Sequence, residues 1–181
     1  MGFLHYRRLA ALILAAAGAA TCGAASAADP NLYFGVKGGV MSSDRSGYDD
    51  SWNAGAVVGL HFLDFNKGKS HYGSLSGEIE GTVPLIKGDV NSPSNGEWRT
   101  WTLGAYAVYH SPDLNNVYFK GKAGAVHRDI TSSPSGISGT GSSDDPAFGV
   151  GVGYRVNKRN SVELEVTFMD TLTFISAGFV F

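Results

Sequence analysis

The chain contains very little cysteine: Cys22 is the only one among its 181 residues, which excludes an internal disulfide framework. It also lacks an excess of basic residues, with 14 Lys and Arg against 16 Asp and Glu, so nothing points to a nucleic-acid partner. After residue 27, no apolar run reaches the roughly 20 residues that a membrane-crossing helix needs. No segment after residue 30 repeats apolar residues with a helical period. What remains is a chain of strands and turns, with 25 glycines and 12% aromatic residues.

Residues 1–27 have the pattern of a secretory signal peptide. Two arginines at positions 7 and 8 precede an apolar run of about a dozen residues, and Ala-Ser-Ala at 25–27 forms a cleavage motif. An uncleaved anchor is disfavoured because the run is short, and a lipoprotein is disfavoured because Ala-Ala-Thr before Cys22 is a poor lipobox. We expect cleavage before Ala28, which leaves residues 28–181 as one domain. Loss of the two arginines leaves 12 basic against 16 acidic residues, a net charge of −4.

Eight segments of the remaining chain show the two-residue periodicity of half-buried strands. They are residues 31–42, 52–64, 74–87, 98–110, 117–130, 146–157, 160–170 and 172–181. Most are close to the 9–11 residues that a tilted membrane-spanning strand needs. An even number of strands brings both chain ends to one side, as in bacterial single-chain barrels. With the export signal, this pattern predicts an all-β fold: an eight-stranded antiparallel transmembrane β-barrel with up-and-down connections, in the outer membrane of a Gram-negative cell.

The connections between the predicted strands alternate in character. Links 43–51, 88–97 and 131–145 are polar, and we expect them to be extracellular loops, the last a mobile low-complexity segment. The links at 112–113 and 157–160 have the composition of tight periplasmic turns. Link 65–73 is long for a periplasmic turn. Long loops outside and short turns inside are typical of such barrels.

Strand parity separates an apolar face from a face of small and polar residues. In segment 146–157, Phe148, Val150 and Val152 share one face, and glycines occupy the other. We expect the apolar face to contact lipid. The charged residues with lumen parity are Lys37, Glu78, Glu80, Lys120, Lys122, Arg128, Arg155, Glu163 and Glu165. An eight-stranded barrel is only wide enough for its own side chains, so we predict that these charges pair and fill the lumen.

Two other interpretations of the lumen charges are an ion path and an acid–base carboxylate pair, Glu78/Glu80 or Glu163/Glu165. Elsewhere, His127 has Asp129 and Ser132 nearby, but Ser132 belongs to the low-complexity segment, a poor platform for catalysis. The histidines are scattered, so we expect no metal site and no cofactor. The aromatic residues near the strand ends are predicted to form interfacial girdles; they are Trp98, Trp101, Tyr106, Tyr109, Tyr118 and Phe119.

Three late segments, YFKGKAG at 118–124, FGVGVGYR at 148–155 and SVELE at 161–165, resemble the late strands of OmpA-type and opacity-type barrels. The resemblance implies an eight-stranded barrel whose final aromatic residues, Phe179 and Phe181, are read by the outer-membrane assembly machinery. The ending Gly-Phe-Val-Phe departs from the more usual Tyr-Arg-Phe. We expect no peptidoglycan-binding domain after the barrel, and therefore no wall-anchoring role.

Together these patterns predict a non-enzymatic, monomeric barrel with a structural or surface-interaction (adhesin-like) role. Its surroundings are outer-membrane lipids and lipopolysaccharide, and a host or surface ligand would bind loops 43–51, 88–97 and 131–145. The alternatives are a narrow porin-like channel, a lipid-modifying outer-membrane enzyme, and a soluble β-sandwich or lipocalin-like barrel. The soluble alternative requires the apolar face to be buried.

Overall fold

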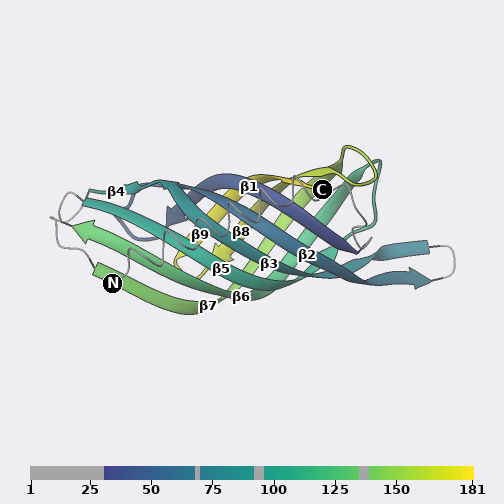
Figure 1. Cartoon of the computed structure of the whole chain (residues 1–181), viewed down its shortest axis with the longest axis horizontal. Helices are drawn as coiled ribbons and strands as arrows, with labels where there is room; N and C mark the ends of the chain where they lie inside the picture. The colour runs from purple at the N-terminus through teal and green to yellow at the C-terminus, as the bar shows by residue number, and fades with distance from the viewer. Residues whose placement is uncertain (1–30, 68–69, 92–95, 135–138) are drawn as a thin grey trace.

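The computed structural model describes residues 31–67, 70–91, 96–134 and 139–181, and these contain strands and turns only (Figure 1). The predicted signal peptide at 1–27 lies outside the described residues. The strands are β1 (Leu32–Ser43), β2 (Ser51–Lys67), β3 (Ser70–Ile86), β4 (Gly88–Val90), β5 (Gly96–His110), β6 (Val117–Pro134), β7 (Gly139–Arg155), β8 (Ser161–Met169) and β9 (Leu172–Val180). None of the described residues belongs to a helix that could cross a membrane.

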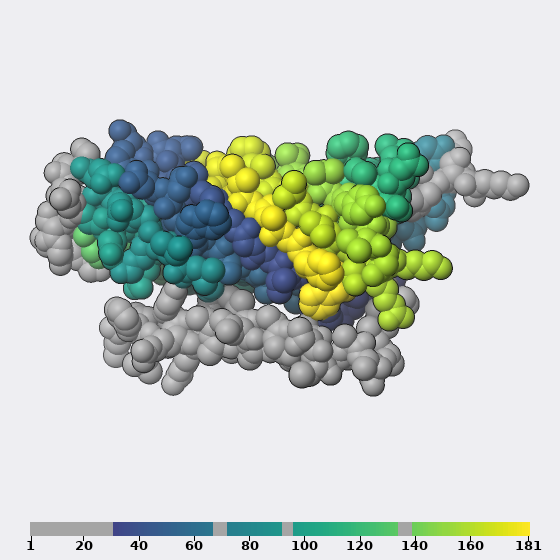
Figure 2. All heavy atoms as spheres, turned by 90° about the horizontal axis from the view of Figure 1, so that it is seen from above, coloured from purple at the N-terminus to yellow at the C-terminus, as the bar shows by residue number. Residues whose placement is uncertain are grey.

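The sheet closes on itself. Strands that follow one another in the sequence pair antiparallel, except that β3 pairs with β5 in place of β4, and β1 also pairs with β9. The short β4 pairs with the start of β5, so β3 and β4 act as one barrel strand interrupted at Lys87. Figure 2 shows the closing seam, where the yellow C-terminal strand lies against the purple-blue β1. The predicted eight-stranded antiparallel barrel with up-and-down connections is therefore confirmed.

Two hairpins are longer than the sequence pattern predicted. β6 and β7 pair as far as Ser132 and Gly139, so the described residues of 131–145 are strand, and the prediction of a mobile loop there is wrong. Link 65–73 is likewise mostly strand, because Lys67 of β2 pairs with Ser70 of β3. In both hairpins the ladder of backbone hydrogen bonds continues beyond the residues whose side chains alternate between apolar and polar. The sequence pattern detects only the alternating part of each strand.

The barrel has two distinct ends. The terminal end holds the start of β1 and the end of β9, and the loop end holds residues 44–50 and β4 (Figure 1). At the loop end, the Trp98 indole N–H donates to the carbonyl of Asp49 at 2.7 Å, and the Asp49 amide donates to the carbonyl of Asp89 at 2.8 Å. The first loop is therefore fixed onto the β4–β5 hairpin. Trp98 itself is buried, so its predicted place in an interfacial girdle is wrong.

The side chains sort by parity into an apolar exterior and a polar interior. On β8, Leu164 is 57% exposed while the adjacent Glu165 is 4% exposed. Val150 and Ile175 are exposed on neighbouring strands, as the lipid-facing interpretation requires. Burying ionic groups inside while leaving large apolar side chains outside is stable only where hydrocarbon surrounds the barrel, because apolar surface otherwise carries a hydration cost.

Candidate functional site

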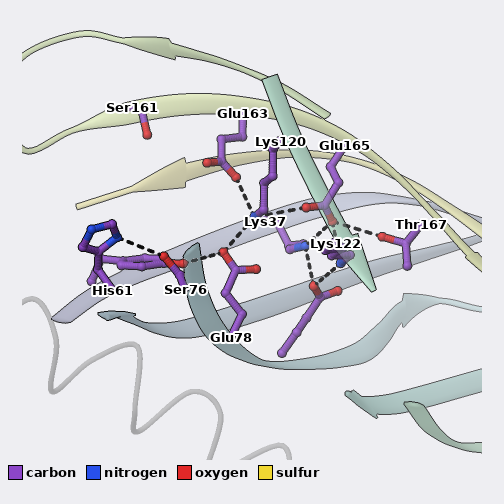
Figure 3. Close-up of polar contacts among 12 residues, drawn as sticks. Lys37, His61, Ser76, Glu78, Lys120, Lys122, Ser161, Glu163, Glu165 and Thr167 are labelled. Atoms are coloured by element: carbon purple, nitrogen blue, oxygen red, sulfur yellow. Dashed lines mark hydrogen bonds and ion pairs between the residues drawn. The ribbon is translucent and has the colours of Figure 1, made fainter. Parts of the chain in front are cut away.

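The barrel interior contains a compact group of ion pairs drawn from four strands (Figure 3). Lys37 of β1 contacts Glu80 of β3 at 2.7 Å and Glu165 of β8 at 2.8 Å. Lys122 of β6 contacts the same two carboxylates, each at 2.7 Å. Two lysines and two glutamates therefore form a closed ring in which every charge has two partners of opposite sign.

A second set of ion pairs lies next to this ring, nearer the terminal end. Lys120 contacts Glu78 at 2.9 Å, Glu163 at 3.1 Å and Glu165 at 3.2 Å. Glu165 thus joins the two sets into one cluster, which we call the lumen ion cluster: Lys37, Lys120, Lys122, Glu78, Glu80, Glu163 and Glu165. The structure brings together seven of the nine charged residues that parity placed inside.

The lumen ion cluster contains four carboxylates and three ammonium groups. Hydroxyl groups stabilise the carboxylates further by donating hydrogen bonds to them. The Tyr33 hydroxyl donates to Glu78 at 2.8 Å, and the Tyr118 hydroxyl donates to Glu163 at 2.5 Å. Thr167 donates to Glu165 at 3.0 Å. Such donors replace the water that each buried carboxylate loses, and without them the desolvation cost would exceed the attraction between the charges.

The two remaining predicted charges lie outside the cluster. Arg128 is buried near the loop end, where it contacts Asp145 at 2.6 Å and Asp170 at 2.8 Å. Arg155 is 42% exposed and pairs with Asp113 at 2.6 Å. The prediction that Arg155 belongs to a buried lumen network is therefore wrong. It lies at the last residue of β7, where the barrel opens and water reaches the guanidinium group.

Above the ion cluster, toward the loop end, a group of apolar side chains lies in the interior together with buried polar residues such as Asn53 and Thr100. The buried side chains here include Met41, Trp98, Val126, Met169, Leu172 and Phe174. Tyr106 lies between the two regions, with its ring 4.3 Å from the Lys122 ammonium group. Tyr106 and Tyr118 are buried in the lumen, so the girdle prediction is wrong for both. Strand parity predicts the lumen position of Tyr118, because Tyr118 lies on the same face of β6 as Lys120.

Glycines make room for the large interior side chains. A Cβ atom on Gly59 would lie 2.0 Å from the Tyr33 ring, and one on Gly153 would lie 2.1 Å from the Tyr118 ring. Each tyrosine ring therefore rests on the backbone of a neighbouring strand. This close approach points the Tyr33 hydroxyl toward Glu78 and the Tyr118 hydroxyl toward Glu163.

Sequence reasoning missed a polar chain at the terminal end. The Nδ1 atom of His61 lies 3.3 Å from the Ser76 hydroxyl, and its Nε2 atom lies 3.0 Å from Asp64. The order resembles a Ser–His–Asp triad, but Ser76 is fully buried, so no substrate carbonyl can reach it. The His127 group differs from the one predicted, because His127 pairs with Asp144 at 2.7 Å and not with Asp129 or Ser132. Within the described residues, no three His, Cys, Asp or Glu side chains form a metal site.

The final aromatic residues lie at the closing seam. The Phe181 amide donates to the carbonyl of Phe34 at 2.8 Å, and the Phe34 amide donates back at 2.9 Å. The rings of Phe34 and Phe181 stack with centroids 6.5 Å apart, and Phe179 packs beside Phe181 at 6.2 Å. These residues hold the two end strands of the barrel together.

Comparison with known families agrees with this architecture. The model of the outer membrane protein β-barrel domain matches residues 10–178. The chain belongs to this family. Its members are outer-membrane barrels, so the chain is an outer-membrane protein. Comparison with curated proteins gives no significant match.

Solved structures share the fold at low sequence identity. Neisserial surface protein A has 16% identity and a TM-score of 0.61, over 82% of this chain and 95% of that chain. Ail, the attachment invasion locus protein of Yersinia pestis, has 18% identity and a TM-score of 0.52, over 83% and 97%. The N-terminal barrel of OprF from Pseudomonas aeruginosa has 14% identity and a TM-score of 0.54, over 82% and 96%. At these identities the likeness shows the fold alone.

Proposed function

We propose that the protein is a monomeric, non-conducting outer-membrane barrel that presents an interaction surface at its loop end. The observation that carries this proposal is the filling of the lumen at two levels. The lumen ion cluster occupies the half nearer the terminal end, and the apolar group around Trp98 and Phe174 occupies the other half. The cavity beside Lys37 measures about 10 Å³, which is room for one water molecule.

An ion would have to break this packing in order to pass. The ammonium group of Lys122 is fully buried between two carboxylates, and packed apolar side chains fill much of the level above it. The buried polar groups at that level are already paired: the Asn53 amide donates to the Thr100 carbonyl at 3.0 Å, and the Thr82 and Thr102 hydroxyls lie 2.7 Å apart. Moving an unpaired ion through such a region is strongly unfavourable. A narrow porin-like channel is the second candidate. It would conduct only if the buried ion pairs exchanged partners to let an ion pass.

The loop end favours a binding role because its described residues are strongly charged. Its acidic residues are Asp44, Asp49, Asp50, Asp89, Glu97, Asp129, Asp144, Asp145 and Asp170, against Arg45, Lys87, Arg99 and Arg128. This gives the described residues of that end a net charge of −5. We propose that segments 43–51, 88–97 and 131–145 bind a basic surface on a host cell or neighbouring cell. The name of Ail, an attachment protein of the same fold, agrees with such a role.

Conductance separates the two candidates. Purified protein is inserted into planar lipid bilayers, with a channel-forming porin measured under the same conditions as the control. We expect no steady unitary current from this protein. A reproducible single-channel current would overturn the closed-lumen proposal and favour the channel.

Attachment tests the loop-end role separately. Cells that display the protein are compared with cells that display a variant in which Asp49, Asp89 and Asp144 are replaced by Asn. Surface amounts are matched by antibody labelling. We expect the variant to attach less to host cells, and equal attachment would contradict an acidic binding surface.

A further inference from the structure

The β6–β7 hairpin projects beyond the neighbouring β8–β9 hairpin at the loop end. β7 pairs with β6 as far as Gly139, whereas its pairing with β8 begins only at Ala147. Among the described residues, the segment Gly139–Pro146 of β7 therefore has a strand on one side and none on the other. At about 3.3 Å per residue, this free edge is about 25 Å long. Figure 1 shows β4, β5, β6 and β7 reaching further at this end than β8 and β9.

The free side of this segment presents backbone hydrogen-bonding groups. The Arg155 amide donates to the carbonyl of Asn116, on the β6 side of β7, at 2.8 Å. The amides of an antiparallel strand point alternately to its two sides, and the β6–β7 register has no bulge. The amide and carbonyl groups of Thr140, Ser142 and Asp144 therefore point away from β6. Further along β7 the groups of this set meet β8, but in the projecting segment they reach no strand of the described barrel.

Two other edges of the sheet are covered or distorted. At the loop end, residues 44–50 lie along β4 and bond to its backbone. At the terminal end, the projecting part of the β2–β3 hairpin has two register shifts, and the Tyr109 hydroxyl donates to the carbonyl of Tyr72 at 2.5 Å. Coverings and bulges of this kind prevent unwanted strand pairing. The β7 edge has no bulge, and Gly139–Asp145 contains neither proline nor lysine.

The side chains beside the β7 edge leave it accessible. Thr140 and Ser142 are small and exposed. The Asp144 side chain is 85% exposed and contacts His127 of β6 at 2.7 Å, on the side away from the edge. A second backbone can therefore approach to the spacing of neighbouring strands, about 4.8 Å.

The charges on both faces of the sheet near this edge favour a basic partner. Arg128, on the inner face, contacts Asp145 at 2.6 Å and Asp170 at 2.8 Å, so one guanidinium group is shared by two carboxylates. With the adjoining loop residues, the region contains five carboxylates, three guanidinium groups and one imidazole: Asp44, Asp129, Asp144, Asp145, Asp170, Arg45, Arg99, Arg128 and His127. The acidic groups outnumber the guanidinium groups, so a lysine or arginine on an added strand would be attracted.

We propose that the free edge of β7, Thr140–Asp145, binds an extended basic peptide segment of a partner protein, which pairs with it as an additional strand. The backbone groups of Thr140, Ser142 and Asp144 supply the hydrogen bonds, and the surrounding carboxylates supply the preference for basic side chains. This inference rests on the proposed function of the loop end and specifies how its partner is held.

The experiment measures fluorescence anisotropy of a labelled synthetic peptide of alternating lysine and threonine with the purified barrel in non-ionic detergent. One control peptide has glutamate in place of lysine, and the other keeps lysine but carries a methyl group on every backbone amide. We expect the first peptide to bind at least about five-fold more tightly than either control, the effect of one lost backbone hydrogen bond. Absence of binding, equal binding of the glutamate peptide, or equal binding of the methylated peptide would overturn the proposal.

Variants locate the site. Ser142→Pro removes an amide that points to the free edge and takes no hydrogen bond from β6, a position where edge strands tolerate proline. It should weaken binding of the lysine peptide at least about five-fold, whereas the matched control Ser142→Ala, which keeps the amide, should not. Heat-modifiable gel mobility shows that each variant has folded. Equal binding by the two variants would overturn the assignment, and so would a dimer of the unmodified barrel that Ser142→Pro abolishes, because the occupant would then be a second copy.

The attachment assay separates this inference from the proposed function. If the Asp→Asn variant loses attachment to host cells and Ser142→Pro retains it, the acidic surface binds without strand pairing and the present inference fails alone. If the barrel binds the lysine peptide through β7 but the Asp→Asn variant attaches as well as the unmodified protein, the proposed role in attachment fails and the peptide site remains.

Discussion

Replacing Lys122 by Met is the most direct test of how the interior is held together. The Lys122 ammonium group is fully buried and contacts Glu80 and Glu165, each at 2.7 Å. Methionine has a similar length and volume, so the substitution removes the charge and leaves little cavity. The lumen ion cluster would then contain two ammonium groups and four carboxylates.

The expected loss of unfolding free energy depends on the ion-pair partners that Glu80 and Glu165 keep in the variant. Removing one partner of a buried ion pair costs about 3–5 kcal/mol, because the other charge stays buried without its partner. Glu80 and Glu165 each keep Lys37, at 2.7 and 2.8 Å, so we expect the lower part of this range, about 3 kcal/mol. At about 2 kcal/mol per molar urea, the unfolding midpoint would fall by roughly 1.5 M.

The assay is equilibrium urea unfolding in lipid vesicles, followed by tryptophan fluorescence and gel mobility. The control is Lys87→Met, which removes an exposed ion pair with Glu97 and should cost less than about 1 kcal/mol. Adding Glu80→Gln to Lys122→Met restores the charge balance and should recover part of the loss. If Lys122→Met changed the free energy of unfolding by less than about 0.5 kcal/mol, Lys122 would not hold the lumen ion cluster together, because ordinary surface substitutions have effects of that size.

Two further predictions concern packing and assembly. Gly153→Ala places a Cβ atom 2.1 Å from the Tyr118 ring and should lower the unfolding free energy by about 1–3 kcal/mol in the same assay, whereas Gly121→Ala, which meets open space, should not. Phe181→Ala should reduce the amount of folded protein in the outer-membrane fraction of cells, because Phe181 holds the seam to Phe34; Phe168→Ala, at the other end of the exterior, should not. Equal amounts of the two phenylalanine variants would contradict an assembly role for the final residue.

The parity of the strands could be predicted from the sequence, and much of the site followed from it. Alternation along β8 is enough to place Glu163 and Glu165 inside and Leu164 outside. The same rule places Tyr118 inside with Lys120, whereas its position near a strand end predicts a place in the interfacial girdle. Ring position depends on which glycine lies opposite, here Gly153, and that is a property of the register between strands.

The lengths of the hairpins were less predictable. Residues 131–134 and 139–145 look like a low-complexity loop because Ser, Gly and Thr carry no apolar alternation. Their strand conformation comes from backbone pairing between β6 and β7, which side-chain composition does not record.

The order of residues is enough to show that the chain is a set of amphipathic strands with ionic groups on the inner face, because alternation along an extended chain fixes which side each residue occupies. It did not determine which charges meet. Lys37 and Glu165 are 128 positions apart, and they pair at 2.8 Å only because the tilt and closure of the barrel bring β1 and β8 to the same depth. The tertiary structure likewise decided that Arg155 reaches water while Lys122 does not, since depth along the barrel axis, and not parity, sets access to solvent.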